Sequence, residues 1–219
     1  MALQTAKKPI IMDVNPSSPV SEAYRTLRTN IDLSQDEYKP RVITVTSSQH
    51  SEGKTTTAVN MAVAFAQTDK KVLLIDAALR NPSLHYIFKL RNTGGLSSLL
   101  QNLHGIHEMV RETHIPNLSV LTSGPTPANP SDILSNKNLE LLLTAYKEHF
   151  DIIIVDTPPA LTVSDAQIIA AKSDGVLLIV QYGKVKKDLI RKVKMSMEHV
   201  HAKILGVVIN KIDKRYMGS

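Results

Sequence analysis

Residues Gly53, Lys54 and Thr55 carry the strongest signal for chemistry in this sequence. They end the stretch VTSSQHSEGKT, which follows an apolar run typical of a buried strand and precedes residues with helical spacing. A turn of this kind presents backbone N–H groups to phosphate at a helix N-terminus, the lysine reaches the β- and γ-phosphates, and the hydroxyl ligates Mg²⁺. The strict pattern has glycine at position 48, where this chain has Ser48. The predicted nucleotide-binding residues are Ser51, Glu52, Gly53, Lys54, Thr55 and Thr56.

Two aspartates, Asp76 and Asp156, each close an apolar run that predicts a strand. The carboxyl ends of parallel strands meet at one edge of a sheet, so we expect both carboxylates near Lys54. Asp156 suits the orientation of a Mg²⁺ water, and Asp76 suits either Mg²⁺ ligation or proton abstraction from an attacking hydroxyl. The predicted metal ligands are Thr55, Asp76 and Asp156. The alternative is that both aspartates cap the helices that follow them.

A guanine-binding alternative comes from Asn210, Lys211 and Asp213, which form an NKxD pattern at the end of an apolar run. P-loop GTPases recognise guanine with such an element. A GTPase switch, however, would have glycine three residues after Asp156, where this chain has Pro159.

Strand-like and helix-like segments alternate along the chain, which predicts an α/β fold: a P-loop NTPase-type, mostly parallel sheet with helices on both faces. We expect one domain over residues 18–213, preceded by an extended arm (1–17) and followed by a short tail (214–219). The predicted strands are 41–46, 71–76, 118–122, 151–156, 175–181 and 204–210, and the predicted helices are 19–30, 54–67, 96–103, 131–149, 164–172 and 184–200. On the helix over 19–30, Glu22, Arg25 and Arg28 share roughly one face, and a solvated charged face is its ordinary explanation.

The composition narrows the class of protein. The 219 residues include no cysteine, which excludes disulfides, thiolate catalysis and Cys-ligated metals. Lys and Arg number 26 against 20 Asp and Glu, a net charge of +6 that suits polyanions. Aromatic residues make up 4% with no Trp, so stacking platforms for nucleic acid are scarce and we expect no nucleic-acid partner. The eight histidines show no metal-ligand spacing, and no apolar run reaches the roughly 18–20 residues of a membrane span. We expect a cytoplasmic protein.

A basic run over residues 184–194 falls on a predicted helix. A solvated helix face is its ordinary explanation. Peripheral association with an anionic membrane, or binding of an acidic partner, is the alternative.

The segment from about Ser21 to Asn210 resembles the bacterial tyrosine kinases, P-loop proteins tied to capsule and exopolysaccharide synthesis. The family's E-x-x-R-x-x-R-T-N helix is matched near the start of this chain, and in the family it mediates ring-like homo-oligomers. The resemblance therefore implies an N-terminal oligomerisation helix with Glu22, Arg25 and Arg28 as its interface residues, followed here by Thr29 and Asn30.

The phosphate loop and the second Walker element also resemble the family. The loop keeps Glu52 through Thr55, with His50 and Ser51 in place of Pro and Gly. The positioning ATPases carry a signature lysine early in this loop, where Gln49 stands, which favours the kinase branch. The family's D-x-D-x-R element keeps Asp76 and Arg80 but has Ala78 at the second acidic position. The resemblance implies the catalytic residues Lys54, Asp76, Arg80 and Asp156.

The resemblance further implies ATP and Mg²⁺ as cofactors, protein tyrosines as substrates, and a transmembrane activator whose tail docks at the nucleotide site and would recruit the kinase to the inner face of the plasma membrane. In relatives the asparagine matching Asn210 lies near the adenine. The family's C-terminal tyrosine cluster is reduced here to Tyr216. Together with Ala78, this keeps open two other hypotheses: a nucleotide-binding assembly module of the polysaccharide machinery with weak or no kinase activity, and a positioning-type ATPase.

Overall fold

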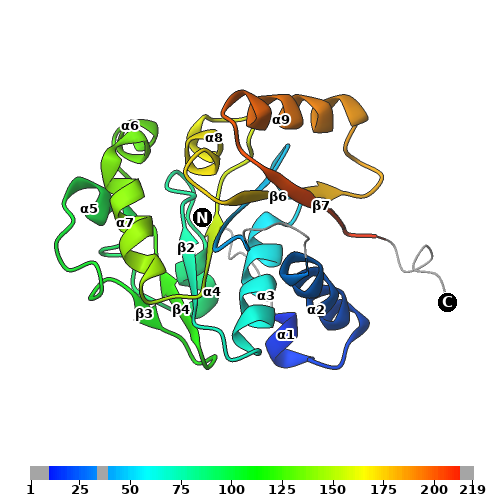
Figure 1. The fold of residues 1–219 in the computed structure, drawn as a ribbon, viewed down its shortest axis with the longest axis horizontal. Coiled ribbons are helices and arrows are strands. Elements are labelled where there is room, and N and C mark those ends of the chain that lie inside the picture. The colour runs from blue at the N-terminus through cyan, green and yellow to red at the C-terminus, as the bar shows by residue number, and fades with distance from the viewer. Residues whose placement is uncertain (1–9, 34–38, 213–219) are drawn as a thin grey trace, which may run out of the picture.

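The computed structural model describes residues 10–33 and 39–212, and within them seven strands form one sheet in the order β3-β4-β2-β5-β1-β6-β7 (Figure 1). Neighbouring strands are parallel except for the antiparallel pair β3 and β4. The strands are β1 Val42–Ser47, β2 Val72–Asp76, β3 Arg111–Glu112, β4 Leu118–Leu121, β5 Ile152–Asp156, β6 Gly175–Gln181 and β7 Ile204–Asn210. The predicted α/β fold is confirmed.

Helices cover both faces of this sheet (Figure 1). Helices α1 to α4 contribute to one apolar cluster, helices α5 to α8 to a second on the other face, and α8 and α9 to a third beside β6. The helices are α1 Ile11–Val14, α2 Pro19–Asp32, α3 Lys54–Ala66, α4 Leu84–Phe88, α5 Leu96–Gln101, α6 Pro130–Ser135, α7 Lys137–Lys147, α8 Asp165–Ala170 and α9 Lys187–His199.

The continuous apolar strands are explained by burial on both faces. Along β5, Ile152 and Ile154 pack in the α3 cluster, whereas Ile153 and Val155 pack in the cluster with α7. Side chains alternate across a strand, so a strand between two helical layers needs apolar residues at every position. Because the central strands are parallel, their last residues lie together at the carboxyl edge of the sheet.

The prediction of an extended arm over 1–17 is wrong for the part that the structure describes. Residues Ile11–Val14 form a helical turn, and Met12 is fully buried against α3, where its N–H donates to Asn60 Oδ1 at 3.0 Å. Burial of Ile10 and Met12 stabilises this turn. Residues 1–9 lie outside the described part of the chain.

The predicted helix over 131–149 is two helices. Asn136 between them is extended (φ −61°, ψ 152°), and its side-chain oxygen accepts from Asn138 N at 3.4 Å. This cap stops α6 and begins α7 in a new direction. The helix predicted over 96–103 ends at Gln101, and those over 164–172 and 184–200 lose residues at both ends.

No helix in the ranges 10–33 and 39–212 has both the length and the apolar character needed to cross a bilayer.

Candidate active site

The loop between β1 and α3 has the shape of a phosphate cradle. Ser51 and Gly53 adopt left-handed backbone conformations, with φ of 64° and 97°. Lys54 opens α3, and the first N–H groups of a helix have no carbonyl partner within it. These donors face out of a helix N-terminus, where a phosphate gains most from them.

Ser48 helps to close this loop. Its hydroxyl donates to Glu52 Oε1 at 2.6 Å, and Gln49 N donates to the same oxygen at 2.6 Å. Glu52 is 2% exposed, so its carboxylate folds back under the loop. The serine that stands in place of the pattern's glycine is therefore part of the scaffold.

Lys54, Thr55 and Asp156 converge at the start of α3. Thr55 Oγ1 donates to Asp156 Oδ2 at 2.6 Å. Burial lowers the pKa of Lys54, and the negative charges of Asp156 and Glu52 act against this shift. Burial, with the nearby charge of Asp76, raises the pKa of Asp156 to about 7, although the Thr55 hydrogen bond and Lys54 oppose that rise.

Asp156 Oδ1 is buried and has no hydrogen-bond partner. A buried carboxylate oxygen without a partner is unfavourable, and a hard cation is the ligand that would satisfy it. The hydroxyl of Thr55 and the carboxylate of Asp156 are oxygen donors of the kind that Mg²⁺ prefers. The donor set therefore fits Mg²⁺ held between this pair and a nucleotide phosphate.

Asp76 lies beside Asp156 in the register of β2 and β5, and it is fully buried. Its Oδ2 accepts from Ser83 N and Leu84 N, both at 2.9 Å, and its Oδ1 accepts from Ala78 N at 3.2 Å. Burial raises the pKa of Asp76, while these three N–H donors act to lower it. Asp76 therefore accepts a hydrogen bond from the first residue of α4, as the capping alternative expects, although the N-cap residue of that helix is Ser83.

Asn210 and Lys211 clasp the phosphate loop from the end of β7. Asn210 Nδ2 donates to Glu52 O at 2.9 Å, and Lys211 Nζ donates to Ser51 O at 2.5 Å. A Cβ at Gly53 would lie 1.9 Å from Asn210 Nδ2. Glycine is needed there both for its positive φ and for this close approach.

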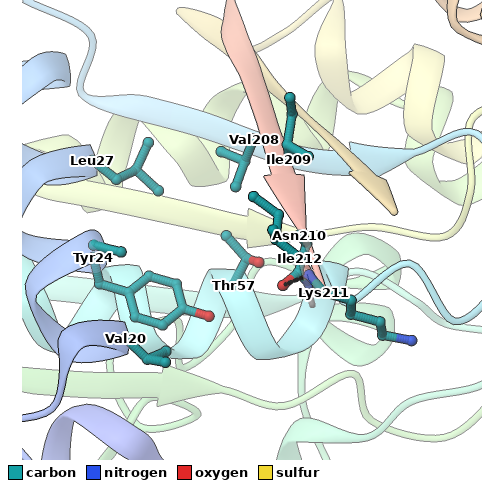
Figure 2. Close-up of a pocket in the computed structure, with 10 residues that line it drawn as sticks. Val20, Tyr24, Leu27, Thr57, Val208, Ile209, Asn210, Lys211 and Ile212 are labelled. Carbon is teal, nitrogen blue, oxygen red and sulfur yellow. Dashed lines mark hydrogen bonds between the residues drawn. The ribbon is translucent and has the colours of Figure 1, made fainter. Parts of the chain in front are cut away.

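A mostly apolar pocket adjoins the clasp, between α2, the second turn of α3 and the end of β7. Figure 2 shows the side chains of Tyr24, Thr57 and Asn210 around it. Asp213, the last residue of the NKxD pattern, lies outside the described residues, as does Tyr216.

Arg80 is directed to another set of residues. Its Nε donates to Asp165 Oδ2 at 3.1 Å, and its Nη2 donates to Ser131 Oγ at 3.1 Å. The structure therefore brings Lys54, Thr55, Asp76 and Asp156 together, while the hydrogen bonds of Arg80 lead to α6 and α8.

The predicted interface residues lie on α2. Arg25 pairs with Glu22 at 2.9 Å and donates to Pro16 O at 2.7 Å, and Arg28 donates to Ala64 O on α3 at 3.3 Å. Glu22 is exposed.

Ser48 and Asp165 were not identified as site residues from the sequence, and Lys211 was named only within the guanine-binding alternative. The one sequence feature that could have indicated Asp165 is its place after the loop that leaves the strand ending at Asp156, because such loops lie at the carboxyl edge of the sheet. No sequence pattern indicated that Lys211 would contact a loop 160 residues earlier in the chain.

The fold and the loop geometry define a P-loop nucleotide-binding domain, and comparisons with known proteins agree. A family model described as an AAA domain matches residues 40–208. Tyrosine-protein kinase YwqD of Bacillus subtilis is 42% identical over 201 residues, which cover 92% of this chain and 85% of the relative. The chain belongs to the family of bacterial tyrosine-protein kinases.

Solved structures support the same assignment. The crystal structure of the chimerical protein CapA2B2 aligns with a TM-score of 0.89 at 40% identity, over 94% of this chain and 90% of that one. The kinase domain of the Escherichia coli tyrosine kinase ETK aligns with a TM-score of 0.91 at 30% identity, over 100% of this chain and 86% of that one.

Proposed function

We propose that this chain is an ATP-dependent protein-tyrosine kinase that regulates capsular or exopolysaccharide synthesis. The observation that supports it most is the convergence of Lys54, Thr55 and Asp156 around a buried carboxylate oxygen that lacks a partner. That arrangement suits a magnesium nucleotide, and the family supplies tyrosine as the acceptor.

In this proposal the nucleotide cradle consists of the backbone N–H groups of Ser51, Glu52, Gly53, Lys54, Thr55 and Thr56, together with the side chains of Lys54 and Thr55. Lys54 would neutralise charge on the β- and γ-phosphates, and Thr55 with Asp156 would hold Mg²⁺, which supplies charge neutralisation when bound. Catalysis is then positioning and charge neutralisation.

Asp76 has a more restricted role than a general base. Because both of its oxygens accept backbone N–H groups, it holds the start of α4 and supplies negative charge to the metal side of the site. Three N–H donors leave about one lone-pair site of the carboxylate, on Oδ1, for a proton or another partner. The family's second acidic residue would stand at position 78, where this chain has alanine.

Asn210 contributes to nucleotide binding through the loop that it clasps, and the adjoining apolar pocket is the proposed side for the nucleobase. Apolar lining with few polar groups is typical of such a subsite.

For partners, we propose a homo-oligomeric ring through α2, with Glu22, Arg25 and Arg28 at the interface, and a transmembrane activator that recruits the cytoplasmic kinase to the plasma membrane. Glu22 is exposed on α2, which supports the ring. The basic residues of 184–194 offer a peripheral contact for an anionic surface.

A second candidate function is favoured by Ala78: a nucleotide-dependent assembly module with weak or no kinase activity. It predicts nucleotide binding without phosphotyrosine.

The test is phosphotyrosine formation on an added tyrosine-containing polypeptide with Mg-ATP, compared between the wild type and Lys54→Ala. The proposal expects a signal from the wild type that Lys54→Ala abolishes together with ATP binding. ATP binding by the wild type with no phosphotyrosine, also in the presence of an activator tail, would support the assembly module instead.

A further inference from the structure

A side-chain cluster that the chemistry above does not use joins the loop after β2 to the first turns of α6 and α8, at the carboxyl edge of the sheet. Asp165, in the first turn of α8, is fully buried, and its ion-pair partner is Arg80, whose side chain is 45% exposed. Ser131 Oγ donates to Asp165 Oδ1 at 2.7 Å, and Arg80 Nη2 also reaches that oxygen at 3.4 Å.

Each member of the cluster lies on a different connection. Arg80 belongs to the loop after β2, Ser131 to the first turn of α6, and Asp165 to the helix reached from Asp156 through residues 157–164. The contacts therefore tie the loop that follows Asp76 to the first turns of α6 and α8.

The loop that carries Arg80 also holds the carboxylate of Asp76. The N–H groups of Ala78, Ser83 and Leu84 bind the two oxygens of Asp76, and Arg80 lies between the first two of these donors in the chain. A guanidinium fork anchored on a buried carboxylate restricts the loop more than a single hydrogen bond would. Such restriction sets where the Asp76 carboxylate lies relative to Asp156.

We propose that Asp165 is a positioning residue of the kinase site, which acts through Arg80 to hold loop 77–83 and thereby keeps the carboxylate of Asp76 beside that of Asp156. In this proposal Asp165 affects the position of the Asp76 carboxylate and contacts neither the metal ion nor the nucleotide. The inference deepens the proposed function and rests on it for its ligand, Mg²⁺ with a nucleotide.

The test uses Asp165→Asn, which keeps the side-chain shape and removes the charge. Asp132→Asn serves as the matched control because Asp132 is exposed on the same short helix as Ser131. Two quantities are measured for each protein: amide hydrogen exchange of residues 77–84 against that of α3, and the affinity for ADP by calorimetry with Mg²⁺ and with EDTA.

The expected result for Asp165→Asn is exchange on the order of tenfold faster in residues 77–84, with α3 unchanged. The gain in ADP affinity that Mg²⁺ confers should fall about tenfold, because the negative charge of Asp76 would no longer be held beside Asp156, while the affinity in EDTA stays at the wild-type level. Asp132→Asn should match the wild type in both quantities.

Exchange that is unchanged in 77–84, or that rises equally in α3, would overturn the proposal, as would an undiminished effect of Mg²⁺. If Asp165→Asn does not fold, the paired variant Arg80→Gln/Asp165→Asn, which buries no unpaired charge, gives the same readings. A wild-type protein that binds no ADP would refute the proposed function. The exchange comparison alone would then test whether Asp165 holds loop 77–83 through Arg80.

Discussion

Asp76 and Asp156 are register partners on adjacent parallel strands, yet their carboxylates have opposite surroundings. Among the described residues, the side chain of Asp76 accepts three backbone N–H groups, whereas that of Asp156 accepts only the Thr55 hydroxyl and keeps one buried oxygen without a partner. Asp76 therefore has its ligands within the protein, and Asp156 is the carboxylate that gains most from a metal ion.

The raised pKa of Asp156 predicts that its neutralisation stabilises the empty protein. Its pKa is 3.8 in a model peptide and about 7 in the fold, so the folded state retains a proton that the unfolded state has lost between these pH values. This group's contribution to the free energy of unfolding therefore decreases as pH rises through that range. At pH 8, without nucleotide, Asp156→Asn should melt several degrees above the wild type, since about 1 kcal/mol shifts the melting temperature by about 2–4 °C in a chain of this size. Differential scanning calorimetry of both proteins at pH 5 and pH 8 measures this, and equal melting temperatures at pH 8 would contradict it.

The same pKa predicts a pH dependence for the Mg²⁺ effect on nucleotide affinity. Mg²⁺ binds the ionised carboxylate, so below about pH 7 its binding must displace a proton from Asp156. The gain in ADP affinity caused by Mg²⁺ should fall by up to about tenfold per pH unit below 7 and level off above it. Calorimetry between pH 5.5 and 8.5 tests this, with ADP in EDTA as the control. A Mg²⁺ effect that is flat over that range would show that Asp156 is ionised throughout.

Ala78→Asp is expected to increase phosphotyrosine formation. The side chain at position 78 is partly exposed and lies next to Asp76, whose oxygens already accept backbone N–H groups. A second carboxylate there could bind the metal ion or accept the proton of the tyrosine hydroxyl. We expect a rise of on the order of 10²-fold, within the range that a positioned acid–base group contributes. Ala78→Asn, which has the same shape without the charge, is the control. Equal rates of phosphotyrosine formation for the two variants would show that the carboxylate at position 78 is not the cause of the increase.

Asn210→Ala should weaken binding of adenine and guanine nucleotides by similar factors. The amide of Asn210 bonds the backbone of the phosphate loop and the N–H of Lys211, so its loss loosens the cradle for any nucleotide. We expect roughly tenfold weaker ADP binding, equivalent to about 1.4 kcal/mol. Titration with ADP and GDP in parallel makes the comparison. A loss confined to one of the two nucleotides would place Asn210 at the base instead.

Glu22→Lys should shift the protein toward the monomer. Glu22 is exposed, its side chain pairs with Arg25, and a lysine there would repel a basic surface on either protomer. Light scattering at several protein concentrations, with and without Mg-ATP, reports the mass. Glu108→Lys, on the connection between α5 and β3, is an exposed control of equal charge change. A wild type that stays monomeric at every concentration would refute the ring.

The sequence was sufficient for the architecture because the central strands are buried on both faces and therefore apolar throughout. Strands β6 and β7 match their predicted ranges, and α3 begins at the predicted Lys54. The short elements were missed: α1 depends on the burial of Met12 against Asn60, and α4 on the carboxylate of Asp76, so tertiary contacts rather than local periodicity stabilise them.

In the candidate site, too, some residues were predictable from local patterns and others depend on tertiary contacts. Lys54, Thr55 and Asp156 were predictable because a motif and a strand end place them locally. The clasp of Lys211 on Ser51 and the pairing of Arg80 with Asp165 join residues far apart in the chain, and no local pattern encodes such contacts.

The most direct test of the central claim is the fate of the γ-phosphate of labelled ATP in the presence of a tyrosine-containing acceptor, for the wild type, Ala78→Asp and Lys54→Ala. If the protein is a P-loop tyrosine kinase, the label appears on tyrosine with the wild type, in larger amount with Ala78→Asp, and not at all with Lys54→Ala. Label released only as inorganic phosphate, in both the wild type and Ala78→Asp, would contradict the account and indicate an ATPase.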